Sequence, residues 1–394
     1  SLGLGAVVAL LVVAILVIVW VVDPNKFKPR IERAVREATG RDFALVGDIE
    51  LGFYPWLALR AGEGRFGNAP GFGNEPMVTW RRVQLGARLF PLLRGELVAD
   101  RVILECADIR LVRLADGRAN WEGIGGEARQ DPNAEPMELR IDGIEVRDTR
   151  VSLVDESAQR HVVVEKLDLS TDGIAPGKPY EDTEISGVLH MDGFAPAGVP
   201  FALEVPKAVV ASDLSAVEVA EFSLTFGAFE AQGGVQGTLG DAPRLAGKIE
   251  SNVFDPRALL TAMGIEPPKT TDPEALGKLQ FAASWRLDGG AVSVDPVTLT
   301  IDDTHFSGNV RMPPEEGAPG EFALRGDVLD IARYIPPTDP DSPPFALPTA
   351  MLKQLAFRGT LELEQATMDD ITMKGVTLLL LLDEQGLRQA PVEK

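Results

Sequence analysis

Residues 139–154 read LRIDGIEVRDTRVSLV and show a period of two. Apolar side chains occupy every second position up to Gly143, where the phase shifts by one residue before the alternation resumes. Such alternation places apolar side chains on one face of a strand and polar side chains on the other. Because Asp-Gly pairs are common in hairpins, we expect Asp142-Gly143 to form a turn between half-buried strands.

The same alternation recurs along the chain after Asp42. Further stretches with this pattern are residues 222–226, 297–301, 355–358 and 361–364. Turn sequences such as Asp288-Gly289-Gly290 separate them at distances typical of hairpins. Helical sequence is sparse, so the pattern predicts a mainly β fold, a long antiparallel meander.

A meander with one apolar face must cover that face or leave it open. A second sheet would give a sandwich with a dry core. Alternatively, the sheet would curl into a trough and leave an elongated apolar groove that suits acyl chains. The period of two is compatible with both arrangements.

The composition excludes several classes of function. The 394 residues include 38 Lys and Arg against 59 Asp and Glu, a net charge of −21, which disfavours nucleic-acid binding. One Cys and three His leave little for a disulfide framework or a zinc site. Adjacent acidic pairs such as Asp302-Asp303 are expected to cap turns, since neighbours on a strand point to opposite faces. We find no nucleophile motif and predict a protein that is not an enzyme and has no cofactor or metal.

The first residues predict a membrane anchor. Leu2 to Val22 contains 21 uncharged, mostly apolar residues, and a helix of that length spans about 31 Å, the thickness of a bilayer core. A cleaved signal peptide has a shorter apolar stretch and a small-residue cleavage site, which is not found here. We therefore predict a transmembrane helix over residues 1–22, with Trp20 at the membrane interface.

Residues 23–41 follow with six basic and three acidic residues, a net charge of +3. Apolar residues recur there at helical spacing, and Gly40 is suited to end a helix. We expect a short amphipathic helix on lipid headgroups, or a surface helix packed on the first strands, and the two are compatible. The predicted membrane-interface residues are Trp20, Lys26, Phe27, Lys28 and Arg30. The charges alone leave the orientation of the chain across the membrane open.

The remaining chain divides at two polar, strand-poor stretches. The predicted segments are a β region at 42–124, a linker at 125–136, β repeats at 137–335 with short helices near 255–264 and 272–277, a linker at 336–348, and the start of a further β region at 349–394.

Several motifs occur in the order found in one protein family. They include Asp23-Pro24-Asn25-Lys26-Phe27, Thr39-Gly40-Arg41, Phe53-Tyr54-Pro55-Trp56, Asn68-Ala69-Pro70-Gly71-Phe72, Asp116-Gly117-Arg118-Ala119-Asn120-Trp121 and Phe254-Asp255-Pro256-Arg257. With these motifs the chain resembles the AsmA family of Gram-negative envelope proteins. The family normally continues well past this C-terminus.

The resemblance implies a fold, a location and a function. It implies one helix in the inner membrane, a periplasmic body, and a β-groove akin to that of chorein-type lipid-transfer proteins, which would carry phospholipid toward the outer membrane and serve its biogenesis. The family supplies no catalytic motif and no set of binding residues. From the strand faces, our groove candidates are Phe222, Leu224, Phe226, Val297, Leu299, Ile301, Leu355 and Phe357. The alternative is a non-transporting scaffold or assembly factor, whose helix docks against other inner-membrane proteins.

Overall fold

The computed structural model describes the chain from Asp23 with several gaps. The described ranges are 23–52, 57–87, 98–124, 140–173, 179–211, 213, 215–240, 242–314, 318–337, 357–368, 370–383 and 386–389. The predicted membrane span with Trp20, the linker at 125–136, most of the linker at 336–348 and the groove candidate Leu355 lie outside these ranges. The described chain is mainly β, as predicted.

The chain forms two units. Unit 1 comprises Ser1–Ala175 and Ile185–Asp192, and unit 2 comprises Pro176–Glu184 and Gly193–Lys394, so that strand β11 (Tyr180–Met191) belongs partly to each. The other elements of unit 1 are η1 (Pro24–Phe27), α2 (Lys28–Thr39), β1 (Phe43–Leu45), β2 (Ile49–Gly52), β3 (Leu57–Ala61), β4 (Gly64–Phe66), β5 (Val78–Trp80), β6 (Arg82–Ala87), β7 (Val98–Glu105), β8 (Asp108–Arg113), β9 (Arg140–Asp155) and β10 (Arg160–Asp172).

The predicted helix at 23–41 consists of a 3-10 turn, η1, followed by α2. Asp23 caps η1 by accepting a hydrogen bond from the Asn25 N–H at 3.0 Å. Gly40 ends α2 in the left-handed conformation with φ of 67°, which glycine adopts without steric cost. Among the described residues, the helices are all too short or too polar to cross a bilayer.

Strand β9 differs from the prediction. Asp142-Gly143 does not turn the chain, because both residues lie inside one 16-residue strand. Gly143 has a different role: a Cβ there would lie 2.6 Å from a carboxylate oxygen of Asp172, which pairs with Arg101 across the strand. The glycine thus makes room for an ion pair that crosses β9.

Strand β9 also joins two sets of strands. Its first half pairs in parallel with β7 and its second half in parallel with β8, and the change falls near Asp148, whose φ is 46°. One set runs β2–β3–β6–β7–β9, and the other runs β1–β4–β5–β8–β9. Unit 1 is therefore not a simple antiparallel meander. A long connection separates β8 from β9, and β9 then pairs in parallel with the earlier strands β7 and β8.

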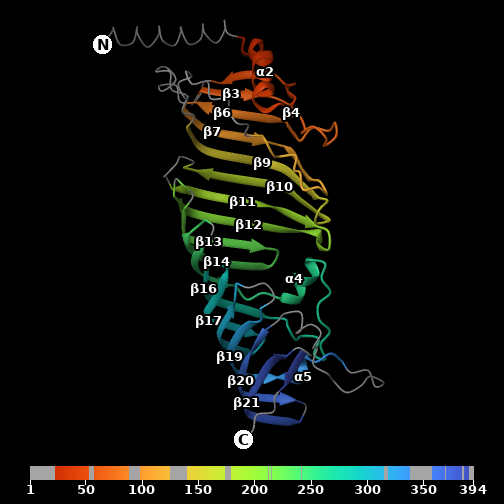
Figure 1. The fold of residues 1–394 in the computed structure, drawn as a ribbon, viewed down its shortest axis with the longest axis vertical. Coiled ribbons are helices and arrows are strands. Elements are labelled where there is room, and N and C mark those ends of the chain that lie inside the picture. Colours follow the sequence, from red (N-terminus) through yellow and green to blue (C-terminus); the bar gives the residue numbers. More distant parts are fainter. Residues whose placement is uncertain are drawn as a thin grey trace, which may run out of the picture. The chain divides into compact units, whose positions relative to one another are not determined.

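Unit 2 follows the predicted meander closely. Its elements are β12 (Phe194–Val210), β13 (Ala216–Phe226), β14 (Phe229–Thr238), β15 (Arg244–Ser251), α4 (Pro256–Ala262), β16 (Leu279–Asp288), β17 (Ala291–Ile301), β18 (Thr304–Met312), β19 (Gly320–Asp330), α5 (Ile331–Tyr334), β20 (Phe357–Met368), β21 (Ile371–Asp383) and β22 (Gly386–Gln389). Successive strands from β12 to β19 pair antiparallel, and Figure 1 shows them in chain order. The β19–β20 pair is parallel, after which antiparallel pairing resumes.

Local signals explain the short elements of unit 2. The Asp255 carboxylate accepts hydrogen bonds from the N–H groups of Arg257 and Ala258 and so starts α4. Gly289 and Gly290, both with positive φ, form the turn between β16 and β17. Residues 272–277 form turns and no helix, unlike the prediction.

Candidate functional site

Apolar residues form continuous rows across the strands of unit 2. Following the pairing register from β13 to β21, one row consists of Phe222, Gly233, Ile249, Ala283, Val297, Gly308, Leu324, Leu361 and Leu378. A neighbouring row consists of Val219, Val235, Gly247, Trp285, Val294, Val310, Phe322 and Gly359. Both rows lie on the same side of the sheet, which we call the apolar face. No charged residue interrupts either row.

The opposite side, the polar face, has a different composition. One of its rows consists of Glu218, Gln236, Ala246, Arg286, Ser293, Arg311, Glu321 and Arg358. Oppositely charged neighbours pair across strands there, as Arg325 and Glu362 do at 2.9 Å. The two faces thus differ as the period of two requires.

The structure brings seven of the eight groove candidates together on the apolar face. Phe222 and Val297 belong to the first row above. The other five pair with residues of the same face: Leu224 with Ala231, Phe226 with Phe229, Leu299 with Phe306, Ile301 with Thr304, and Phe357 with Gly320. The described membrane-interface candidates, Lys26, Phe27, Lys28 and Arg30, lie in η1 and α2 of unit 1.

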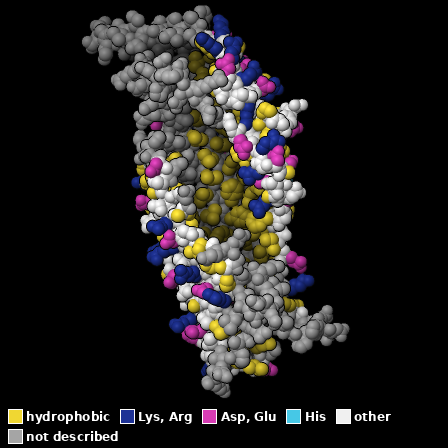
Figure 2. All heavy atoms as spheres, viewed as in Figure 1, with side chains coloured by type: hydrophobic (Ala, Val, Ile, Leu, Met, Phe, Trp, Pro, Cys, Tyr) yellow, Lys and Arg dark blue, Asp and Glu magenta, His cyan; other side chains and the backbone are white. Residues whose placement is uncertain are grey.

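The apolar face of unit 2 is open to solvent. None of the seven candidates is fully buried, and the buried apolar residues of this unit are few and mostly small: Ala195, Val199, Ala231, Ala275, Leu363 and Ala366. Within the described part of the chain, no second sheet packs on this face. In Figure 2 hydrophobic side chains line a hollow at the level of β12 to β14, the first strands of unit 2, and charged side chains border its rims. Among the described residues, the arrangement is therefore an open sheet and not a dry sandwich.

Sequence reasoning missed several residues of the apolar face. Trp285 lies in the second row, opposite Gly247, and Phe306 and Phe322 belong to the same face. The signal was present, because Phe281, Ala283, Trp285 and Leu287 alternate with smaller or polar residues along β16.

An aromatic cluster occupies the end of this face next to α4. Phe229 packs against Phe254 in a T-shaped pair at 5.0 Å and stacks on Phe281 at 6.2 Å, and Phe194 stacks on Phe226 at 6.4 Å. Pairs of this geometry add stability beyond the burial of their area. The C-cap of α4 is bound to β12 by the hydrogen bond from the Ala195 N–H to the Met263 carbonyl. The rings and α4 therefore lie together at this end of the apolar face, where the five phenylalanines are half-buried.

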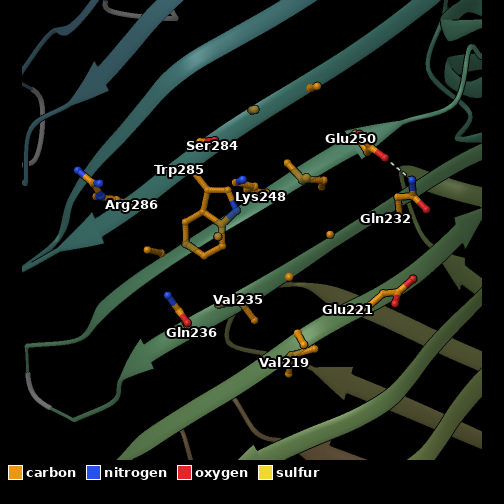
Figure 3. A pocket seen from close by; sticks show the side chains of 18 of the residues that line it. Val219, Glu221, Gln232, Val235, Gln236, Lys248, Glu250, Ser284, Trp285 and Arg286 are labelled. Carbon is orange, nitrogen blue, oxygen red and sulfur yellow. Dashed lines mark hydrogen bonds between the residues drawn. The ribbon is translucent and has the colours of Figure 1, made fainter.

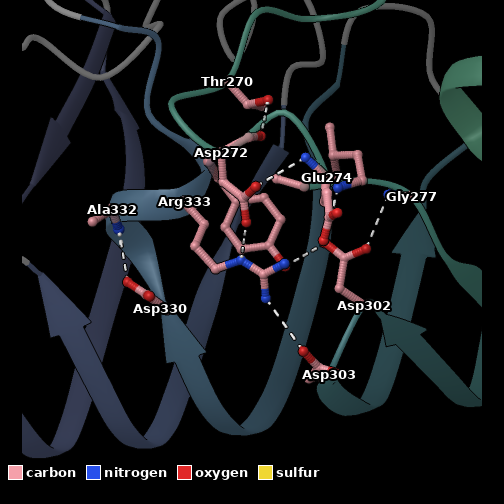
Figure 4. Close-up of polar contacts among 12 residues, drawn as sticks. Thr270, Asp272, Glu274, Gly277, Asp302, Asp303, Asp330, Ala332 and Arg333 are labelled. Carbon is pink, nitrogen blue, oxygen red and sulfur yellow. Dashed lines mark hydrogen bonds and ion pairs between the residues drawn. The ribbon is translucent and has the colours of Figure 1, made fainter.

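A polar network, which we call the clasp, fixes the loop between α4 and β16 (Figure 4). The Asp302 carboxylate accepts hydrogen bonds from the N–H groups of residues 276–278 at 2.8–3.0 Å and from the Tyr334 hydroxyl at 2.8 Å. Arg333 of α5 donates to Asp272 at 2.8 Å and pairs with Asp303 at 3.3 Å. Asp302 therefore binds a distant loop, rather than only capping its own turn.

The clasp shifts the acidity of its members. Burial raises the pKa of Asp302, but the hydrogen bonds it accepts lower it more, so that the pKa lies below its ordinary value of 3.8. Burial and the hydrogen bond to Asp302 raise the pKa of Tyr334. These groups satisfy one another, which is typical of a structural contact.

A cavity of about 1050 Å³ lies over β13–β17, and its lining includes Val219, Val235 and Trp285 of the apolar face as well as residues of the polar face (Figure 3). Charged side chains of both signs line it, including Glu221, Lys248, Glu250 and Arg286, and Gln232 donates a hydrogen bond to Glu250. Within the described ranges, no three His, Cys, Asp or Glu side chains are grouped as metal ligands. Mixed charge without convergent donors gives this cavity no evident ligand.

Comparison with known proteins agrees with the motifs quoted above. The AsmA family protein YhjG of Escherichia coli K12 is 30% identical over 198 residues, which cover 46% of this chain and 28% of that relative. No solved structure matches the chain. Residues 2–215, more than half of the 394 residues, match the AsmA family. The chain therefore belongs to the AsmA family.

Proposed function

We propose that this protein is anchored in the Gram-negative inner membrane and takes part in phospholipid transport to the outer membrane through its apolar face. The main support is the pair of uninterrupted apolar rows that cross unit 2 on an open side of the sheet. Membership of a family of envelope-associated proteins agrees with this role. No catalytic role forms part of the proposal.

Acyl chains suit this surface on energetic grounds. Each CH₂ group removed from water contributes about 0.8 kcal/mol, so even a partly covered acyl chain would be held firmly. The charged residues at the rims of the hollow would leave a lipid headgroup in water among polar partners (Figure 2). An open trough would also let lipids move along it without a headgroup crossing the apolar floor.

The amphipathic helix α2 supports attachment to a bilayer. Lys26, Arg30 and Arg33 are exposed and form no ion pair within the described part of the chain, and Phe27 is 46% exposed beside them. Basic residues near an anionic membrane surface contribute about 1 kcal/mol each. We propose that this helix lies on the headgroups at the end of the anchor predicted for residues 1–22.

Lipid analysis of the purified full chain tests the proposal. Phospholipid should co-purify, and the triple variant Leu224→Asp, Val297→Asp, Leu299→Asp should lose most of it, because three carboxylates would enter the apolar face. The matched control is Ser223→Asp, Thr298→Asp, Thr300→Asp. It places three carboxylates at adjacent positions of the same strands but on the polar face, and it should keep the lipid.

Two results would contradict transport. Equal lipid in the apolar-face variant and the wild type, with both folded, would show that the lipid binds elsewhere. A wild-type chain without any bound lipid would favour the alternative function, a scaffold that docks against other membrane proteins.

A further inference from the structure

Aromatic rings lie directly over glycines on the apolar face of unit 2. In five cases the glycine is the register partner of the aromatic residue on the neighbouring strand: Gly233 with Phe222, Gly247 with Trp285, Gly326 with Phe306, Gly320 with Phe357, and Gly359 with Phe322. A Cβ added at any of these glycines would lie 2.4–2.9 Å from a ring carbon. Each ring is thus in contact with the backbone of the next strand.

The contact determines how high each ring rises above the sheet. A ring that rests on a backbone adds only its own thickness of about 3.5 Å to the floor of the trough. With any larger residue in place of the glycine, the ring would have to move up into the open space. Glycine weakens a strand relative to residues with side chains, so five such positions opposite rings call for an explanation.

We infer that these ring-over-glycine pairs set the depth of the trough and therefore how much acyl chain it holds. The inference rests on the proposed function, since it concerns the capacity of the same apolar face. The pairs occur from β13 to β20, so the floor stays low along the unit. Extended acyl chains would lie on the flat rings. Gly320 and Gly326 would set the amount of acyl chain that the trough holds without contacting the lipid headgroup.

Two glycines allow a clean test. At Gly326 the three atoms nearest to an added Cβ belong to side chains, those of Leu363 at 2.7 Å and Phe306 at 2.9 Å, and at Gly320 the three nearest belong to the ring of Phe357. At Gly233, by contrast, it would come within 2.2 Å of a backbone carbonyl oxygen. Gly326→Ala and Gly320→Ala should therefore lift a ring while leaving the strand pairing intact.

The measurement is the number of phospholipids bound per full chain, obtained by native mass spectrometry. Gly320→Ala should lower that number relative to the wild type. Adding Phe357→Leu to Gly320→Ala should restore it, because the smaller side chain leaves the added methyl group room. Strand damage caused by the alanine itself predicts no such rescue of lipid binding. Gly326→Ala should also lower the number, and it replaces Gly320→Ala in the comparison with the wild type if Gly320→Ala does not fold.

The outcomes separate the two proposals. A wild-type chain that binds phospholipid, together with a folded Gly326→Ala or Gly320→Ala variant that binds the same number, would overturn the inference and leave the transport proposal standing. A wild-type chain without lipid would overturn both. Fewer lipids in Gly320→Ala without rescue by Phe357→Leu would assign the loss to strand damage and would also overturn the inference.

Discussion

Arg41 is a buried charged residue of unit 1 with several partners. It is 5% exposed, and its guanidinium donates to the backbone carbonyls of Asn120 at 2.6 Å and Glu122 at 2.7 Å. It also contacts the Met77 sulfur and lies 5.7 Å from the centre of the Phe66 ring. Burial lowers the pKa of Arg41. The residue thus joins the start of the chain to the loop after β8.

Replacing this residue should destabilise unit 1. Arg41→Met removes the donor from two carbonyls, and because Asn120 is fully buried while Glu122 is exposed, the loss should cost about 1–3 kcal/mol. Denaturant unfolding of the full chain should show the loss as a lower midpoint. Arg65→Met is the matched control, because Arg65 is exposed on β4, and it should change stability little. Equal midpoints for the two variants would contradict the assigned role.

At this scale the sequence indicated which residues matter but not their contacts. Arg41 and Asn120 both fall in motifs that carry the family resemblance, yet they are 79 positions apart. Local periodicity describes neighbours on one strand and contains no information on such distances. Gly143 was misinterpreted for the same reason, since its partners Arg101 and Asp172 come from other strands.

Among the short elements, the clasp gives a prediction for pH. The Asp302 carboxylate has a lowered pKa in the folded chain, so its ionised form contributes stability above the unfolded value and loses it as pH falls through the folded one. Asp302→Asn should reduce the free energy of unfolding at neutral pH by about 1–2 kcal/mol and so lower the melting temperature. The difference from wild type should shrink below about pH 4.

The adjacent carboxylate serves as the control. Asp303 has an 86% exposed side chain and only one ion pair, with Arg333, so Asp303→Asn should melt close to the wild type at every pH. Thermal unfolding followed by circular dichroism at several pH values would check both variants. A difference for Asp302→Asn that persists undiminished in acid would rule out ionisation as its cause.

Elements with local signals were predictable, and those that depend on distant pairing were not. The cap at Asp255, the stop at Gly40 and the turn at Gly289 each satisfy backbone groups within a few residues. The parallel pairs of β9 leave no such signal. Residues 272–277 resemble the first turn of a helix. The N–H groups of residues 276–278 donate to Asp302, however, so no helix continues from this turn.

At the scale of the whole molecule, one side of α2 already contacts the first strands of unit 1 and the turn between them. Lys28 pairs with Asp48 at 3.1 Å, and Glu32 accepts a hydrogen bond from the Leu45 N–H at 2.9 Å. In η1, the Asn25 side chain bonds both the N–H and the carbonyl of Ile49. If the opposite face rests on a bilayer, the first strands of unit 1 must lie close to the headgroups.

This arrangement predicts contact with anionic lipid. The full chain would carry a fluorophore at Ala34→Cys, on the exposed face of α2, with Cys106→Ser removing the native thiol. In vesicles of phosphatidylcholine and phosphatidylglycerol, a quencher attached to headgroups should quench it more than in phosphatidylcholine alone. Salt should weaken the effect, since screening acts over about 8–10 Å at 0.10–0.15 M.

Two variants distinguish the basic residues of α2 that are free to contact lipid from Lys28, which is already in an ion pair. Arg30→Gln with Arg33→Gln should weaken the preference for anionic vesicles strongly, whereas Lys28→Gln should preserve it, because Lys28 already pairs with Asp48. Equal quenching in both kinds of vesicle for the unaltered helix would refute the contact.

The mainly β fold and the position of the apolar face could be predicted because alternation along a strand assigns each residue to a side. Seven of eight candidates share that side for this reason. Whether the face is open depended on what packs against it, which the period of two does not record. Alternation along β16 also marks Trp285, but the contacts of the Trp285 and Phe306 rings with glycines could not be predicted, because those glycines lie on other strands.

The two parallel pairings of β9 also affect how the chain folds. Arg113 and its partner Asp155 are 42 positions apart, so β7 and β8 present unpaired edges until β9 has been made. Closing such a long loop is slow relative to adding a hairpin. In unit 2, by contrast, each strand up to β19 can add to the one just before it. We therefore expect β9 to set the rate of folding in unit 1, while unit 2 grows strand by strand.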